Sequence, residues 1–288
     1  CGTRALIQEV AQTALDLTAL VISRNEEANL PGLIANLRGL VTEIVIVDDR
    51  SDDATRAIAE AAAPFVRFVA RPMDPDAGFA GQRNHALSLA ATAWVIHMDC
   101  DERVSRDLAG EMRATLPGST LNAYRYTRLN YFLNRPMRHG GWNSWNRPQI
   151  CRRGAHRVTG RLHEACEIDG GDAATGQMRG LMHHLNDHDF AQRLGKSAQY
   201  SAMEADRLLA SGRRVRARDL AMRPVLEFGK KYVAKQGFRD GVPGLISALH
   251  SATAAFRAHA LAWDRQNPAD RSAIESRLAA SDDDTRQG

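Results

Sequence analysis

Short apolar runs rich in β-branched residues alternate with helix-like segments along the first 115 or so residues. The runs are LTALVI, TEIVIV, VRFVA and WVIHM. Helical patterns follow them over about residues 29–40, after residue 53, over about 79–91 and from near residue 105. Strands separated by helices of this length are joined by right-handed crossovers, which place neighbouring strands parallel. The alternation therefore predicts an α/β fold, a mostly parallel sheet flanked by helices.

The rest of the chain follows a different pattern. Beyond Leu116, segments such as NAYRYTRLNYFL and RHGGWNSWNR are irregular, aromatic and glycine-rich, and we expect strands and loops that cover one end of the sheet. Residues 190–264 have a helical pattern, and the terminal SDDDTRQG is typical of a disordered end. We therefore expect an α/β domain over residues 16–190, a helical region over 191–265 and a disordered tail over 266–288.

Composition and cysteine spacing restrict the class of protein. The chain has 288 residues, of which 44% are hydrophobic, so it can bury a large core. Its four cysteines form no CxxC pair and no zinc-type spacing, so a reducing, cytosolic compartment fits best. No apolar run reaches about 18 residues and no signal region is evident, so neither a membrane span nor secretion is predicted. Cys1 in place of Met indicates a trimmed fragment, with a lipidated Cys1 as the alternative.

Positive charge is concentrated in one stretch. The formal net charge is +4, yet residues 213–239 hold nine Lys or Arg against Asp219 and Glu227. Such a stretch favours lipid phosphates, an anionic acceptor or nucleic acid as its partner. Because each basic residue near anionic lipid contributes about 1 kcal/mol, the stretch predicts peripheral contact with a membrane surface. A solvated basic helix is the competing interpretation.

Polar clusters follow three of the predicted strands directly. They are SRNEE, DDRSDD and DCDER, and open parallel sheets bind ligands beyond the carboxyl ends of their strands. In DCDER, Asp99 and Asp101 are two residues apart, which puts both carboxylates on one side of an extended segment. At roughly 4 Å and an effective dielectric near 20 they repel by about 4 kcal/mol, so they need a cation such as Mg²⁺ or Mn²⁺. The alternative is a solvated acidic turn that caps the next helix.

The other clusters offer contacts for a nucleotide. Asp48 and Asp49 end the run TEIVIV, where a carboxylate can accept a hydrogen bond from a base or a ribose; a turn and helix cap is the competing explanation. Arg83, in QRNHAL, starts a predicted helix at the same sheet edge. Its guanidinium can pair with diphosphate oxygens, although an exposed helical arginine explains it equally well.

In this order, LVISRNEEANL, IVIVDDRSDDAT, GFAGQRNHAL and WVIHMDCDERVS resemble the family 2 glycosyltransferases of the GT-A fold. Further segments, NYFLN, RHGGW, RLHE, LMHH and KQGFRDGVPGL, are similar to lipopolysaccharide core β-1,4-glucosyltransferases. The resemblance covers about residues 17–263. The ordered series is far more specific than any single motif.

The resemblance implies roles for individual residues. Asp49 would bind uracil, Asp99 and Asp101 would bind the metal and the diphosphate, and Arg83 would lie near the phosphates. The donor would then be a UDP-sugar, plausibly UDP-glucose. The family usually has Ala between the two aspartates, where this chain has Cys100, and a thiol there would be sensitive to oxidation.

Inverting transfer also needs a base that takes the proton of the acceptor hydroxyl. Glu164, in RLHEACEI, is the candidate, and nearby carboxylates compete with it: Glu167, Asp169 and Asp172. His163 would orient the base or complete the metal shell, and His183 or His184 would be the alternative ligand. Trp142 and Trp145 are candidates for stacking on acceptor sugars, with core packing as the simpler alternative.

These features predict an inverting, metal-dependent transfer of a hexose, glucose by preference, from a UDP-sugar to a lipid-linked saccharide such as lipopolysaccharide core. The enzyme would act in the cytoplasm or on the cytoplasmic face of the inner membrane. One alternative is a nucleotidyltransferase, although SRNEEAN is not a glycine-rich phosphate loop. Another is a non-catalytic basic scaffold for membrane or nucleic acid, but aromatic residues are not interleaved with the basic stretch, and no nucleic acid partner is expected.

Overall fold

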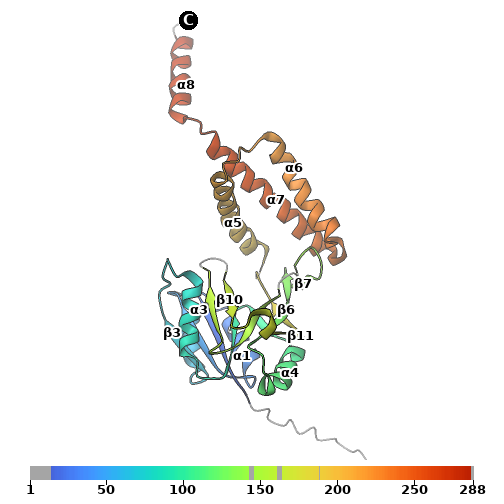
Figure 1. Ribbon diagram of the computed structural model, residues 1–288. Coiled ribbons are helices and arrows are strands. Elements are labelled where there is room, and N and C mark those ends of the chain that lie inside the picture. The colour runs from blue at the N-terminus through green and yellow to red at the C-terminus, as the bar shows by residue number, and fades with distance from the viewer. Residues whose placement is uncertain (1–13, 143–145, 161–163, 188, 287–288) are drawn as a thin grey trace, which may run out of the picture. The chain divides into compact units, whose positions relative to one another are not determined.

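The computed structural model describes residues 14–142, 146–160, 164–187 and 189–286, with side chains up to residue 279. Three residues of the sequence analysis, Cys1, Trp145 and His163, lie outside this set. The chain divides into two compact units (Figure 1). The first comprises residues 1–138 and 142–186, and the second comprises 139–141 and 187–288. This division falls a few residues before the expected boundary at residue 190.

A nine-stranded sheet forms the centre of the first unit. Its strands are β1 (Leu15–Ser23), β2 (Val41–Asp48), β3 (Val66–Ala70), β4 (Trp94–Met98), β5 (Glu102–Val104), β6 (Ala123–Phe132), β7 (Arg135–Pro136), β8 (Asn146–Arg152) and β11 (Thr175–His184). They lie in the order β3, β2, β1, β4, β8, β6, β11, β5, with β7 paired to β6. Strands β1 to β4, β6 and β11 run in one direction, and β8 and β5 run against them. The predicted α/β fold with a mostly parallel sheet is therefore confirmed.

Helices cover both faces of this sheet. They are α1 (Leu30–Leu37), α2 (Thr55–Ala61), α3 (Gly78–Leu89) and α4 (Arg106–Thr115). Successive side chains of a strand point to opposite faces. Leu17 of β1 accordingly belongs to the same apolar cluster as Leu33 of α1 and Leu108 of α4. Leu20 packs in a second cluster with Ala86 of α3. Because both faces are covered, the central strands are buried almost without interruption, as expected for a parallel sheet.

A smaller element completes the first unit beside α3. Strands β9 (His156–Thr159) and β10 (Ala165–Ile168) form an antiparallel pair, and β9 packs against α3. The short helix η1 (Leu116–Gly118) lies between α4 and β6, and η2 (Gly171–Ala174) lies between β10 and β11. The segment beyond Leu116 therefore supplies strands, as expected from its irregular aromatic pattern.

Strand register brings the polar clusters to one edge of the sheet. Ser23 pairs with Asp48 across β1 and β2, and Val21 pairs with Met98 across β1 and β4. Parallel strands end on the same side, so the segments that follow Ser23, Asp48 and Met98 lie together. The fold thus gathers the three acidic sequences that the sequence analysis selected.

The second unit is helical. Its elements are α5 (Phe190–Ala210), α6 (Ala217–Phe228), η3 (Gly229–Ala234), η4 (Gly237–Asp240), α7 (Gly241–Gln266) and α8 (Arg271–Arg286). Helices α5 and α6 both pack along α7. No helix in the described part of the chain is both long enough and apolar enough to cross a membrane.

The C-terminal segment differs from the expected disordered tail, because α8 occupies most of it. Its sequence, RSAIESRLAASDDDTR, contains many good helix formers. Asp270 accepts hydrogen bonds from the backbone N–H and the hydroxyl of Ser272, and Arg271 pairs with Glu275 one turn later. These local contacts, rather than packing, account for the helix, since its described side chains are exposed.

Candidate active site

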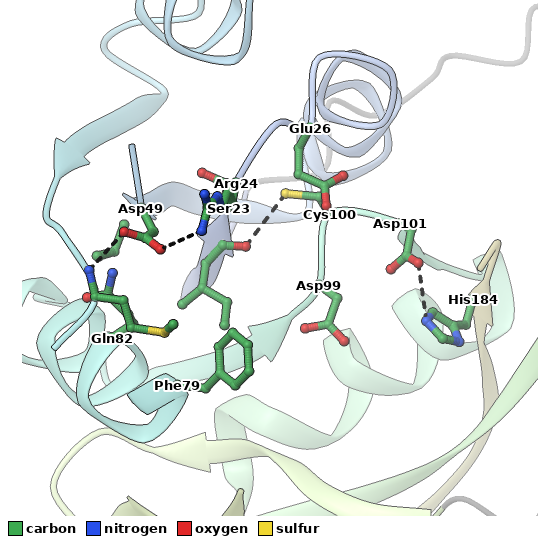
Figure 2. A pocket seen from close by; sticks show the side chains of 13 residues that line it. Ser23, Arg24, Glu26, Asp49, Phe79, Gln82, Asp99, Cys100, Asp101 and His184 are labelled. Atoms are coloured by element: carbon green, nitrogen blue, oxygen red, sulfur yellow. Dashed lines mark hydrogen bonds and ion pairs between the residues drawn. The ribbon is translucent and has the colours of Figure 1, made fainter. Parts of the chain in front are cut away.

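A pocket of about 360 Å³ opens at the sheet edge where the polar clusters meet. Asp49 and Arg24 lie at one end of it, and Asp101 and His184 lie at the other (Figure 2). Asp99 also lines it. The pocket therefore joins the predicted nucleotide contact to the predicted metal ligands, although these residues lie far apart in the sequence.

The two adjacent aspartates of DDRSDD have different surroundings. Asp48 is buried, and its carboxylate accepts hydrogen bonds from the hydroxyls of Ser23 (2.7 Å) and Ser51. Asp48 does not line the pocket. Asp49 does: one oxygen accepts from the backbone N–H of Met73 (2.9 Å), and the other lies 3.5 Å from a guanidinium nitrogen of Arg24. The geometry favours a ligand contact for Asp49 and a turn-stabilising role for Asp48, whose binding role stays a prediction.

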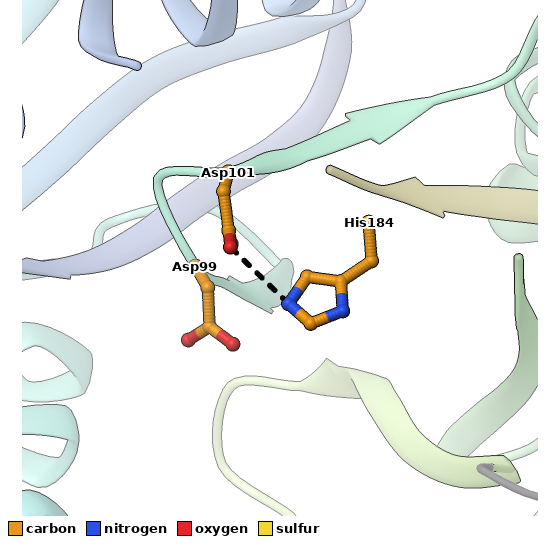
Figure 3. Close-up of side chains that lie close together, drawn as sticks. All are labelled: Asp99, Asp101 and His184. Carbon is orange, nitrogen blue, oxygen red and sulfur yellow. Dashed lines mark ion pairs between the residues drawn. The ribbon is translucent and has the colours of Figure 1, made fainter. Parts of the chain in front are cut away.

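Three side chains form a cluster suited to a divalent cation: Asp99, Asp101 and His184 (Figure 3). One ligand atom from each lies within 4.8 Å of the others. The aspartates follow β4, and His184 ends β11. His184 pairs in register with Glu102 of β5, the residue next to Asp101. The antiparallel pairing of β11 with β5 therefore carries the histidine to the acidic turn.

The hydrogen bonds of His184 fix which ring nitrogen faces the aspartates. Its Nδ1 lies 2.7 Å from Oδ1 of Asn130, whose amide nitrogen donates to the carbonyl of Trp142. Since that oxygen only accepts, Nδ1 carries the proton and donates it. Nε2 then faces a carboxylate oxygen of Asp101 at 3.3 Å. In the neutral ring Nε2 is a metal ligand atom, and two carboxylates with one imidazole suit Mg²⁺ or Mn²⁺.

Of the two histidines in LMHH, His184 and not His183 reaches the aspartates. His183 lies beside Tyr131, with Nδ1 3.2 Å from the phenol oxygen. Adjacent residues of a strand point to opposite faces, so only one of the pair can face the turn. His163, the other histidine considered, lies outside the described residues.

Asp99 also contacts two arginines. One carboxylate oxygen lies 2.6 Å from Arg83, and the other lies 3.6 Å from Arg128. Burial by itself would raise the pKa of Asp99, but the two guanidinium groups outweigh it and hold that pKa below its usual value. Asp99 therefore stays ionised and available to a cation at neutral pH.

Behind Asp99, a buried ion pair supports the turn. Glu102 accepts a hydrogen bond from the backbone N–H of Asp99 (2.8 Å) and pairs with Arg128 at 2.6 Å. Burial raises the pKa of Glu102 to about 7, although Arg128 opposes this rise. Glu102 thus fixes the backbone of the acidic turn. The sequence analysis missed this role because DCDER alone does not show which carboxylate turns inward.

Cys100, between the aspartates, is buried and its sulfur lies 3.8 Å from the carbonyl oxygen of Ile22. Burial, reinforced by nearby carboxylates, raises its pKa well above the usual value. The protonated thiol is a poor nucleophile, so the structure argues against the oxidation sensitivity expected from the sequence.

A second cavity, of about 140 Å³, meets the first pocket at Asp99. Glu164 lines it, 3.2 Å from Nε of Arg83. Arg83 also lines this second cavity rather than the first pocket, so its expected contact with a diphosphate stays a prediction.

Two of the carboxylates that compete with Glu164 for the role of base are paired with other residues. Glu167 pairs with Arg157 and accepts from Thr159, and Asp172 pairs with Arg125. Of the four carboxylates considered, Glu164 alone lines either of the two cavities in the described part of the chain. Trp142 packs against Phe132, with ring centroids 5.5 Å apart, which matches the core-packing alternative for that residue.

The model for "Glycosyl transferase family 2" matches residues 18–167, more than half of the chain. The chain belongs to glycosyltransferase family 2. The resemblance carried by the ordered motifs is thereby confirmed, and the matched segment contains both aspartates of the cluster and Glu164. His184 lies beyond it.

Curated relatives extend the similarity to nearly the full length. The lipopolysaccharide core biosynthesis glycosyltransferase LpsC of Rhizobium meliloti is 30% identical over 259 residues, which cover 87% of this chain and 93% of LpsC. An uncharacterized glycosyltransferase of Rickettsia felis is 23% identical over 250 residues, covering 83% of this chain and 87% of the relative. Both alignments are longer than the first unit, so the similarity extends into the second unit.

Solved structures show weaker similarity. S. aureus TarS residues 1–349 align with a TM-score of 0.42 at 15% identity, covering 87% of this chain and 91% of that structure. Glucosyl-3-phosphoglycerate synthase from Mycobacterium tuberculosis aligns with a TM-score of 0.42 at 16% identity, covering 68% and 80%. The GT-A fold of this glycosyltransferase follows from its strand order and its family, and these alignments add nothing further about the site.

Several residues at the site had no signal in the sequence. Phe79 and Gln82 line the first pocket, and Arg128 and Arg147 line the second cavity. Gln82 could have been found as the neighbour of Arg83 in QRN. The arginines of β6 and β8 lie in segments without a diagnostic pattern, and only strand pairing brings them to Asp99.

Proposed function

We propose that this family 2 glycosyltransferase transfers a hexose, glucose by preference, from a UDP-sugar to a lipid-linked saccharide such as lipopolysaccharide core, with inversion at the sugar carbon. The observation that carries the proposal is the convergence of Asp99, Asp101 and His184 at one end of a pocket whose other end holds Asp49. The similarity to LpsC, a lipopolysaccharide core glycosyltransferase, supports the acceptor class.

The donor would lie along the first pocket. Asp49 would accept a hydrogen bond from the uracil ring N–H, and Asp99, Asp101 and His184 would hold Mg²⁺ or Mn²⁺ beside the diphosphate. A divalent ion held there would neutralise charge on the departing diphosphate. The hydrogen bond between Asn130 and Nδ1 of His184 leaves Nε2 aimed at this position. The chain's contribution is therefore a preorganised set of ligands.

Glu164 would be the base. The acceptor hydroxyl oxygen forms a bond to the sugar carbon while the bond from that carbon to the diphosphate oxygen breaks, and the hydroxyl proton passes to the Glu164 carboxylate. Glu164 lines the second cavity, which shares Asp99 with the first pocket, and inversion requires that the base face the acceptor. Arg83 positions this carboxylate through its Nε.

We also propose that the enzyme works at the cytoplasmic face of the inner membrane, bound peripherally by the basic stretch 213–239. Apolar side chains that are half exposed or more lie within the same stretch: Met222, Val225, Leu226, Val233 and Phe238. A surface that combines basic and apolar groups suits anionic lipid.

Thermal denaturation with and without Mn²⁺ tests the donor assignment. UDP-glucose and UDP should each raise the melting temperature by several degrees near 100 times their Kd, since ligand binding then stabilises by about 2.7 kcal/mol. The rise should require Mn²⁺ or Mg²⁺ and should be absent with GDP-sugars. Equal shifts with GDP- and UDP-sugars, or shifts that ignore the metal, would contradict the proposal.

Glu164→Gln tests the base. Transfer should fall by roughly 10²–10⁴-fold, because a positioned base supplies acceleration of this size. The thermal shift with UDP and Mn²⁺ should stay unchanged. Glu167→Gln changes a carboxylate of β10 that lies three positions along and pairs with Arg157; this variant is the matched control and should keep full activity.

A further inference from the structure

The second cavity, which the proposed base lines, is lined mainly by charged and polar side chains. Three arginines line it: Arg83 of α3, Arg128 of β6 and Arg147 of β8. The carboxylates that line it are Asp99 and Glu164. Of these arginines, Arg128 is already paired with Glu102 behind the cavity, so the donors left for a ligand are those of Arg83 and Arg147. Asp99 also belongs to the proposed metal cluster.

The guanidinium of Arg83 is only partly satisfied. It donates through Nη2 to Asp99 at 2.6 Å and through Nε to Glu164 at 3.2 Å. Its Nη1 is buried and has no hydrogen-bond partner among the described residues, while the side chain is 10% exposed. Leaving a buried charged donor without an acceptor is costly. A ligand oxygen in the cavity that Arg83 lines would satisfy it.

Arg147 is charged but has no carboxylate partner. Its Nη1 donates to the backbone carbonyl of Glu164 at 2.9 Å, and within the described part of the chain no carboxylate oxygen lies within 4.0 Å of its guanidinium. The side chain is exposed at the rim of the cavity. Arg147 can therefore turn its remaining donors to an anion without breaking an existing ion pair.

The size of the cavity fits a small charged group. Its volume of about 140 Å³ is well above the roughly 10–15 Å³ that a single water needs. A phosphate or carboxylate with part of its sugar fits this space, and both groups match the planar donor fork of arginine. Glu164, the proposed base, lines the same cavity, so a group held there would belong to the acceptor.

We propose that the second cavity binds an anionic group, phosphate or carboxylate, on the acceptor saccharide, and that Arg147 is a specificity-determining residue for it. The inference rests on the proposed function, because it takes Glu164 to face the acceptor. Arg83 would supply its free Nη1 and Arg147 would close over the anion from the rim. Neutral saccharides would lack the partner that these donors require.

Calorimetric titration of the enzyme saturated with UDP and Mn²⁺ tests the site with three small probes: glucose 6-phosphate, glucuronate and glucose. We expect at least one of the charged sugars to bind tenfold or more tightly than glucose, and the tighter of the two identifies the anionic group. Arg147→Gln should reduce that preference roughly tenfold or more, since it removes hydrogen bonds to a charged group. The affinities for UDP and glucose should not change.

Arg56→Gln is the matched control. Arg56 lies on α2 with its side chain 66% exposed and pairs with Glu60, away from both cavities. It should bind all three probes as the wild type does. Equal affinities for charged and neutral sugars, a preference that survives Arg147→Gln, or displacement of the charged probes by UDP would each overturn the inference. Failure of UDP to bind at all would instead contradict the proposed function.

Discussion

The two units of this glycosyltransferase differ in whether their large apolar side chains are buried or exposed. In the first unit, large residues such as Leu17, Leu33 and Leu108 fill the space between sheet and helices. In the second unit, large apolar residues are mostly on the surface. Among the described exposed large apolar side chains, Phe79 belongs to the first unit and the other fourteen belong to the second.

Small residues explain the difference. The buried positions of α5 are Ser197, Ser201 and Ala205, and those of α7 are mostly Gly, Ala, Ser and His. Helices that meet through small residues approach closely and leave no room between them for Leu, Met or Phe, which therefore face outward. Where such exposed apolar side chains are contiguous, they mark an interaction site. The first unit thus gathers polar side chains at one sheet edge, whereas the second unit exposes most of its large apolar side chains, the surface proposed above to contact lipid.

The largest effect expected is loss of transfer on changing the metal cluster. Asp101→Asn removes a charged ligand, and transfer with Mn²⁺ should fall roughly a thousandfold, since a bound metal contributes several kcal/mol to the reaction barrier. Radiolabelled sugar transfer measures the loss. Asp52→Asn, an exposed aspartate in the same unit, should keep activity. If Asp101→Asn transfers sugar at the wild-type rate, the cluster of Asp99, Asp101 and His184 is not the catalytic metal site.

A second change addresses the helical unit. Replacing the exposed Arg214, Arg218 and Lys230 by alanine should weaken binding to vesicles containing phosphatidylglycerol about 100-fold, at about 1 kcal/mol per charge. Vesicle sedimentation measures the loss, and soluble donor hydrolysis should not change. A triple replacement of Arg38, Arg56 and Arg157, exposed in the first unit, is the control. If both triple variants lose vesicle binding to the same extent, the proposed distinction between the two units is wrong.

A third prediction concerns the support of the metal cluster. Asn130→Ala removes the acceptor that fixes the Nδ1 proton of His184, and affinity for Mn²⁺ should fall about 10–100-fold. Asn130→Asp keeps an acceptor oxygen and should retain most of the affinity. Asn122→Ala, which loses a bond to the carbonyl of Asp169 on the same unit, is the control. Mn²⁺ titration followed by electron paramagnetic resonance should separate the three.

The smallest effect expected is a pH dependence of stability in the first unit. Burial, together with the charge of Arg83, lowers the pKa of His97 well below its usual value, and its Nε2 lies 2.9 Å from that of His156. His97 is therefore neutral in the folded protein, whereas the unfolded chain takes up a proton below about pH 6.5. Stability due to this residue is complete above that pH and falls as the pH decreases.

Chemical denaturation at pH 7.5 and 5.5 measures this effect. The free energy of unfolding should fall by about 1 kcal/mol more in the wild type than in His97→Gln. A similar fall in both proteins would show that His97 does not titrate on unfolding.

Patterns of neighbouring residues were sufficient to predict the helices and strands of the first unit and the two aspartates of the candidate site. The alternation of strands and helices predicts the parallel sheet because each element's pattern is carried by neighbouring residues. Asp99 and Asp101 were predicted as ligands for the same reason, since their spacing alone places both carboxylates together. The sequence analysis did not predict helix α8. An exposed helix of this kind depends on weak local contacts, and its acidic, polar sequence resembles that of a disordered segment.

The sequence by itself determined the order of strands and helices, the acidic turn after β4 and the basic stretch of the second unit, because each depends on residues close together in the chain. Only the tertiary structure decided between His183 and His184, turned Asp49 toward the pocket and Asp48 away from it, and brought Arg147 to Glu164. These choices depend on which face of a strand meets which neighbour, and strand pairing over long sequence separations sets that relation.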